Sequence, residues 1–290
     1  MRLSKALRFA VRQIAGAGYS RPRGLIFLIG HMRCFSTLLS HQIGSNPDVA
    51  GYFEAHQKYR NKLDLLELAE KIERAGGHTP NGRFLFDKLL HPLLIRDAVL
   101  QRRDLKLILM VREPEATIRS ILKICAGGVC SAEEAAGYYV RRLQQMREIL
   151  ERRRGRALYL EAEALIDDSA STLHRITEYL GLEVALTEAY ERFPLTGRAK
   201  FGDPSDWIGQ GMIVRHRGEA AYAGAPPQAD AARAAYEEFR RYAQFAAESA
   251  ILHPSTLDAA TPGRVELKSS ARGGGADSGQ RQRSPAAFSS

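Results

Sequence analysis

LIFLIGHMRCFSTLL, residues 25–39, combines a short apolar run, a turn and the start of a helical segment. The apolar run ends at Gly30, a pattern typical of a strand buried on both faces of a parallel sheet. Leu39 and Ile43 then follow at a spacing that indicates a helix. A loop between such a strand and helix presents backbone N–H groups and the positive end of the helix dipole. The stretch therefore predicts an anion-binding loop.

This loop departs from the Walker A pattern in an informative way. Gly30 and Thr37 occupy the expected positions, but Phe35 replaces the second glycine and Ser36 replaces the lysine. The missing lysine disfavours a standard ATP or GTP hydrolase. A basic residue is present instead inside the loop, at Arg33.

A second segment offers another anion site. Residues 105–111 form an apolar run that predicts a buried strand, and Arg112 follows it directly. Pro114 suits the first turn of a helix, and Ser120 lies two turns into that helix. An Arg fork and a Ser hydroxyl so placed can converge on one phosphate. A structural ion pair is the alternative explanation of Arg112.

Together these two elements resemble the 5′-phosphosulfate loop and the 3′-phosphate element of sulfotransferases. Those enzymes use 3′-phosphoadenosine-5′-phosphosulfate (PAPS), and the resemblance is to the bacterial and Golgi-like branch that carries an arginine in the loop. The similarity spans about residues 24–220 and is specific in the two elements above. It implies a set of donor-binding residues: Gly30, His31, Met32, Arg33, Cys34, Phe35, Ser36, Thr37, Arg112, Ser120, Ser205 and Gly211.

The same resemblance implies catalytic roles. Arg33 is expected to contact the 5′-phosphate and the leaving oxygen. Lys88 lies at the end of a predicted strand and is expected to contact the sulfuryl group. Glu54 is expected to be the base, with His56 as a rival because imidazole titrates near neutrality. Either residue can instead be a surface charge on a loop. No metal is expected, because fixed Arg and Lys side chains neutralise the transferred charge.

Two other function classes remain open. One is a P-loop-like nucleotide kinase, disfavoured by Ser36 in the lysine position. The other is a non-catalytic nucleotide-binding relative, because Phe35 stands where a small residue is usual and could crowd the phosphate. The acceptor is not specified by the sequence, and small-molecule, carbohydrate, lipid and tyrosyl acceptors are all compatible.

Predicted strands alternate with predicted helices along the chain. Such alternation predicts an α/β, P-loop-like three-layer fold, with a central parallel sheet and helices on both faces. Ligands then bind at the carboxyl ends of the strands. The expected strands are 25–30, 84–87, 105–111 and 157–161, and the expected helices are 36–45, 59–75, 92–102, 114–124, 131–154 and 170–180.

The net charge of +9 comes from the two ends of the 290-residue chain. Residues 1–23 carry six basic and no acidic side chains, and residues 263–290 carry five basic and two acidic ones. The single domain expected between them, residues 24–262, is therefore neutral, which argues against a nucleic-acid partner. The basic N-terminal segment is expected to pack on the core or to contact a membrane surface. The Gly- and Ser-rich tail is expected to be disordered.

The sequence favours a cytoplasmic protein. Its cysteines, Cys34, Cys125 and Cys130, are sparse and odd in number, which suits a reducing compartment, and they lack metal-ligand spacing. No apolar run reaches the ~20 residues that span a bilayer, and a secretory signal pattern is missing.

Overall fold

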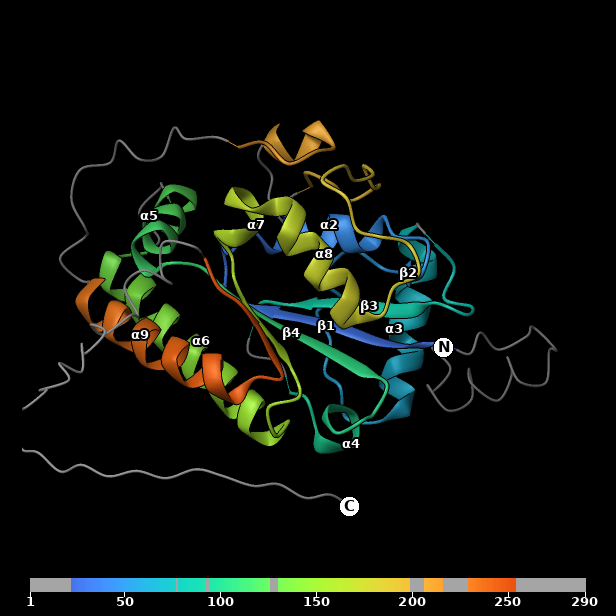
Figure 1. Ribbon diagram of the computed structural model, residues 1–290, viewed down its shortest axis with the longest axis horizontal. Helices are drawn as coiled ribbons and strands as arrows, with labels where there is room; N and C mark the ends of the chain where they lie inside the picture. The colour runs from blue at the N-terminus through green and yellow to red at the C-terminus, as the bar shows by residue number, and fades with distance from the viewer. Residues whose placement is uncertain are drawn as a thin grey trace, which may run out of the picture.

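The computed structural model describes residues 22–76, 78–91, 94–125, 130–198, 206–215 and 229–253. In these residues a central sheet lies between helices on both sides (Figure 1). The tail predicted at residues 263–290, and nearly all of the basic segment 1–23, lie outside the described residues. Within the described part, no helix is long and apolar enough to cross a membrane.

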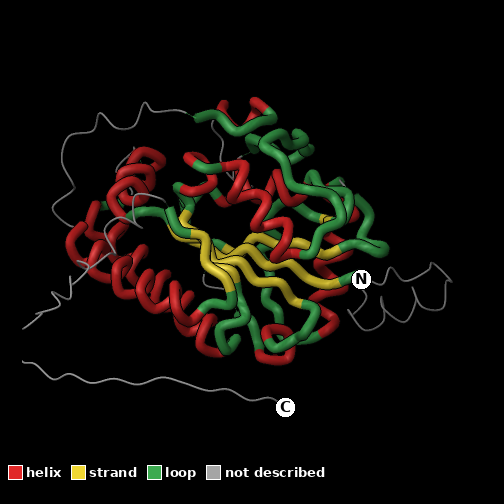
Figure 2. Tube along the Cα trace, viewed as in Figure 1, coloured by secondary structure: helices red, strands yellow, loops and turns green. Residues whose placement is uncertain are grey.

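The sheet is entirely parallel, in the order β2-β3-β1-β4-β5-β6. Figure 2 shows its strands as one twisted layer. Because β1 pairs with β3 on one side and β4 on the other, the connections diverge beside it, where α/β proteins bind ligands. The strands are β1 (Gly24–Gly30), β2 (Val49–Ala50), β3 (Phe84–Leu89), β4 (Leu105–Val111), β5 (Leu158–Glu161) and β6 (Ser249–Ile251).

Alternate side chains of each strand point to opposite faces and enter two separate cores. The helices are α2 (Ser36–Gly44), α3 (Lys62–Ala75), α4 (Asp97–Leu100), α5 (Pro114–Ile124), α6 (Ala132–Arg152), α7 (Ala164–Asp167), α8 (Ser169–Leu180) and α9 (Ala229–Ala246), with a 3₁₀ helix η1 (Asp206–Gln210). The core that contains Phe27 of β1 also contains side chains of α3, α5, α6 and α9, whereas the core that contains Ile26 and Leu28 also contains side chains of α2 and α8. The predicted three-layer α/β fold is thus confirmed.

Within the described residues 94–102, the prediction of a helix over 92–102 is wrong except at Asp97–Leu100. Ile95 forms a parallel bridge with Tyr59, so the chain is extended there. Backbone bonds from Tyr59 to the carbonyl of Leu94 and from Arg96 to the carbonyl of Tyr59 fix this arrangement. The long-range pairing outweighs the local helical pattern.

The cysteines also depart from expectation. Cys125 and Cys130 form a disulfide at the end of α5, although the sequence favoured reduced cysteines. Cys34 is buried in the loop after β1. Burial raises the pKa of the Cys34 thiol, which keeps it neutral and makes it a small core residue rather than a reactive thiolate.

Candidate active site

The loop between β1 and α2 has the backbone of an anion-binding turn. Arg33 and Phe35 both adopt left-handed backbone conformations, with φ of 66° and 59°. Phe35 is the N-cap of α2, yet no side chain caps the helix and its first turn holds no acidic residue. The positive end of the helix dipole therefore faces a position suited to an external anion.

His31 fixes the loop to the end of β4. Its Nδ1 lies 2.9 Å from the carbonyl oxygen of Met32, and its Nε2 lies 3.0 Å from the backbone nitrogen of Arg112. Burial lowers the pKa of His31 to about 3, so the ring is neutral at ordinary pH. The two backbone partners then select one tautomer, in which Nδ1 donates to Met32 and Nε2 accepts from Arg112.

Two side chains of α6, Tyr138 and Arg142, form hydrogen bonds to the loop and to the end of β3. Arg142 is buried and donates to the carbonyl oxygens of Gly30, at 2.7 Å, and Leu89, at 2.6 Å. Tyr138 accepts from the backbone N–H of Met32 at 2.9 Å and donates to the carbonyl of Leu90 at 3.3 Å. The ends of β1 and β3 are thereby held in register by one helix.

The predicted pair Arg112 and Ser120 lies together with Arg33. Arg33 Nε donates to Ser120 Oγ at 2.8 Å, and Arg112 Nη1 donates to the carbonyl of Arg33 at 3.2 Å. The Arg112 guanidinium also covers the ring of Phe35, 4.1 Å from its centroid. Phe35 therefore has a role as a cation–π partner that orients Arg112.

Glu163 borders the same cluster. Its carboxylate lies 3.9 Å from Arg112 Nε and accepts from the backbone N–H of Glu113 at 3.1 Å. Burial raises the pKa of Glu163 to about 7. An ion pair thus accompanies Arg112, as the alternative interpretation of this residue anticipated, but it is long and leaves the guanidinium beside the loop.

Lys88 approaches the loop from β3. It is fully buried, and its Nζ donates to Thr37 Oγ1 at 3.3 Å, at the start of α2. Its neighbour Asp87 points to the opposite face, where it accepts from the backbone N–H of Ala55 and from the hydroxyl of Tyr59. The alternation along β3 places the cation on the α2 side and the acid under the 54–56 loop.

Both candidate bases lie on that 54–56 loop. Glu54 is buried, and its Oε1 accepts from the backbone N–H of Leu90 at 3.2 Å. His56 is half exposed, and its Nδ1 lies 3.7 Å from Glu54 Oε1. Glu54 is linked to the anion loop through the backbone of Leu90 and then Tyr138.

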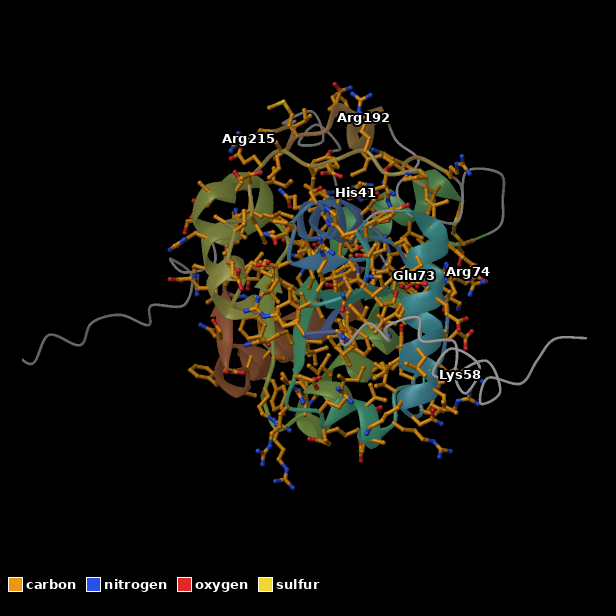
Figure 3. All side chains as sticks on the ribbon, turned by 90° about the vertical axis from the view of Figure 1, so that its right-hand side faces the viewer. His41, Lys58, Glu73, Arg74, Arg192 and Arg215 are labelled. Atoms are coloured by element: carbon orange, nitrogen blue, oxygen red, sulfur yellow. A yellow bond between two sulfur atoms is a disulfide. The ribbon has the colours of Figure 1, made fainter. Side chains whose placement is uncertain are left out.

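Residues 190–198, late in the chain, contact α2. Figure 3 shows His41 on α2 below the surface region that carries Arg192 and Arg215. His41 Nε2 lies 2.8 Å from Thr196 Oγ1 in that segment, and burial lowers the pKa of His41 to about 4. Of the two donor-binding residues predicted late in the chain, Gly211 accepts from the backbone N–H of Tyr190 through its carbonyl oxygen, and Ser205 lies outside the described residues.

The structure thus brings Arg33, Lys88, Arg112 and Ser120 to the predicted loop and places Glu54 beside it. Sequence reasoning missed Tyr138 and Arg142. The sequence does contain a signal for Arg142, because this residue lies on the same face of α6 as the buried residues Tyr139 and Met146. Burying an arginine there costs free energy unless it has hydrogen-bond partners, so its position indicates a structural role.

Comparison with solved structures identifies the fold. The sulfotransferase domain from the curacin biosynthetic pathway is 16% identical, with a TM-score of 0.56 over 76% of this chain and 99% of that domain. The sulfotransferase domain from the Synechococcus PCC 7002 olefin synthase is 19% identical, with a TM-score of 0.49 over 77% and 96%. No protein-family model and no curated protein matches the sequence. The first of these two similarities shows that the chain shares the fold of that sulfotransferase domain.

Proposed function

We propose that the protein transfers a sulfuryl group from PAPS to a hydroxyl or amine acceptor. The observation that carries this proposal is the gathering of Lys88, Arg33 and Arg112, from three adjacent strand ends, around the uncapped start of α2. Three cations and a helix N-terminus suit a donor with phosphates at two positions. The shared fold supports the same assignment.

Different residues are assigned to the two ends of the donor. The loop N–H groups, Thr37 and Lys88 are assigned to the 5′-phosphosulfate, and Arg112 and Ser120 to the 3′-phosphate; the contacts of Lys88 with Thr37 and of Arg112 with the loop support this assignment. Arg33 is assigned to the 5′ end, although its Nε is bonded to Ser120. Ser120 Oγ accepts from Arg33 Nε and can donate its own hydroxyl hydrogen to a 3′-phosphate, so the bond to Arg33 is compatible with both assignments.

Glu54 is assigned as the general base. The acceptor oxygen attacks sulfur while its proton passes to the Glu54 carboxylate, and the bond between sulfur and the bridging oxygen breaks. Lys88 and Arg33 neutralise the charge that develops on that oxygen. The Leu90 N–H holds the carboxylate in place at 3.2 Å, so little reorganisation is needed during the reaction.

Ligand-induced thermal stabilisation tests the proposal without knowledge of the acceptor. Adenosine 3′,5′-bisphosphate should stabilise the protein without Mg²⁺, by about 2.7 kcal/mol at 100 times its Kd. Arg112→Ala should weaken bisphosphate binding by about 2–5 kcal/mol, with little change for 5′-AMP, since 5′-AMP has no 3′-phosphate for Arg112 to contact.

Arg74→Ala is the matched control, because Arg74 is an exposed arginine of α3 paired with Glu70. This variant should bind both nucleotides as the wild type does. Equal losses for the two nucleotides in Arg112→Ala would show that Arg112 does not contact the 3′-phosphate. Stabilisation by ATP only with Mg²⁺ would favour a kinase instead.

A further inference from the structure

Glu54, His56 and His91 meet at one point beside β3. One ligand atom from each lies within 4.8 Å of the others. Glu54 Oε1 is 3.7 Å from His56 Nδ1, and the two imidazole rings are stacked with their centroids 6.0 Å apart. The sequence spacing does not reveal this cluster, because His91 reaches it only after the chain has passed through α3 and β3.

Hydrogen bonds hold the backbone at Ala55 and at Leu90, next to the ligand residues. The Ala55 N–H donates to Asp87 Oδ1 at 2.8 Å, and its carbonyl accepts from Lys71 Nζ at 2.8 Å. The Leu90 N–H, next to His91, donates to Glu54 itself. His56 has a φ of 48°, in the left-handed region that few non-glycine residues adopt. The ligand atoms are therefore presented by a rigid frame, as a preorganised site requires.

The three side chains of the cluster differ in their exposure to solvent. The Glu54 side chain is 6% exposed, the His56 side chain is 46% exposed, and His91 is exposed. An ion from solvent would meet the imidazoles first and the carboxylate at the bottom. Lys71, the cation nearest the loop carbonyl, is paired with Glu67 at 3.6 Å, which reduces its repulsion of a second cation.

We propose that Glu54, His56 and His91 form a binding site for Zn²⁺ or a similar borderline divalent ion. Two imidazoles and one carboxylate are a ligand set that zinc takes, with a fourth position left for water. Zinc bonds of about 2.0–2.2 Å at tetrahedral angles place ligand atoms roughly 3.3–3.6 Å apart. The 3.7 Å separation of Glu54 and His56 is close to that value. Mg²⁺ is disfavoured because it requires oxygen ligands in an octahedron.

The site also bears on the function proposed above, and this consequence rests on that function. A zinc ion bound by Glu54 would take up the carboxylate assigned as the base. Zinc would therefore inhibit sulfuryl transfer, and a chelator would restore it. The binding proposal itself needs no activity and is tested separately.

Metal titration of the full chain, without nucleotide, tests the site directly. Zn²⁺ should bind with one equivalent by calorimetry, and Co²⁺ in its place should give the visible absorption of a tetrahedral ion. His91→Ala should weaken zinc binding by about 100-fold or more, beyond the 10–100-fold loss typical of an outer-shell partner. His91→Gln serves as a second variant that keeps side-chain size.

The matched control is His174→Ala, an exposed histidine on α8 that pairs with Glu178 and lies outside the cluster. It should bind zinc as the wild type does. No saturable zinc binding, or equal affinities in the His91 and His174 variants, would overturn the proposal. Normal bisphosphate stabilisation in the same preparation would leave the proposed function standing, so the two failures are distinguishable.

Discussion

Gly30, at the start of the anion loop, has no room for a side chain. A Cβ at this position would lie 2.7 Å from Cys34 Sγ and 3.0 Å from the carbonyl oxygen of Met110. Gly30→Ala should therefore lower the free energy of unfolding by about 1–3 kcal/mol, measured by urea denaturation. Gly209→Ala is the control, since nothing lies within 4 Å of its Cβ position, and it should stay within about 0.5 kcal/mol of the wild type.

Glu54 and His56 can be separated as bases by conservative substitutions. Glu54→Gln keeps an oxygen that can accept from the Leu90 N–H but removes the base. Turnover should fall by about 10²–10⁴, while bisphosphate binding stays unchanged. The measurement is release of adenosine 3′,5′-bisphosphate from PAPS with a panel of acceptors. Near-full activity in Glu54→Gln together with loss in His56→Asn would assign the base to His56.

The site residues that could be predicted from the sequence are those whose residue type and position together indicate a chemical role. Arg33, Arg112 and Ser120 were predicted from strand ends and helix spacing, and the structure brings them together. The contact between Arg33 and Ser120 was not predicted, because it depends on the left-handed backbone of the loop. The role of Phe35 beneath Arg112 likewise depends on a tertiary contact.

At the scale of elements, α6 supports the site through Arg142. Its guanidinium serves two buried carbonyls, of Gly30 and Leu89, and a lysine at this position can reach only one of them well. Arg142→Lys should reduce the free energy of unfolding by about 1–3 kcal/mol and weaken bisphosphate binding. Arg141→Lys, at an exposed position of the same helix, should change neither by a measurable amount. Equal effects in the two variants would contradict a supporting role for Arg142.

Elements with strong local patterns were predicted well, and those that depend on distant partners were not. β1, β4 and α5 lie within a residue of their expected bounds, since apolar runs and Pro114 mark them clearly. β2 and β6 are short, and their pairing with β3 and β5 defines them rather than any pattern of their own. α9, which packs on α6, lies beyond the last expected element, the helix 170–180.

At the scale of the whole molecule, buried ionisable groups shape the pH dependence of stability in opposite directions. Burial lowers the pKa of His31 to about 3 and of His41 to about 4. The neutral rings therefore contribute to the free energy of unfolding above about pH 6.5, and this contribution is lost as the pH falls. Burial raises the pKa of Asp87 and of Glu163 to about 7. The neutral carboxyl groups contribute to the free energy of unfolding at about pH 4, and this contribution is lost as the pH rises through 7.

Asp87→Asn isolates one of these contributions. Above pH 7 the wild type must keep a charged carboxylate buried beneath the 54–56 loop, whereas at pH 4 the carboxyl is neutral and Tyr59 still bonds to it. The stability advantage of the wild type over Asp87→Asn should therefore shrink by about 2–4 kcal/mol between pH 4 and pH 8, since one pKa unit corresponds to about 1.36 kcal/mol. Urea unfolding of both proteins across this range measures the difference. Parallel curves would mean that Asp87 ionises alike in the folded and unfolded chains, against the burial that the structure shows.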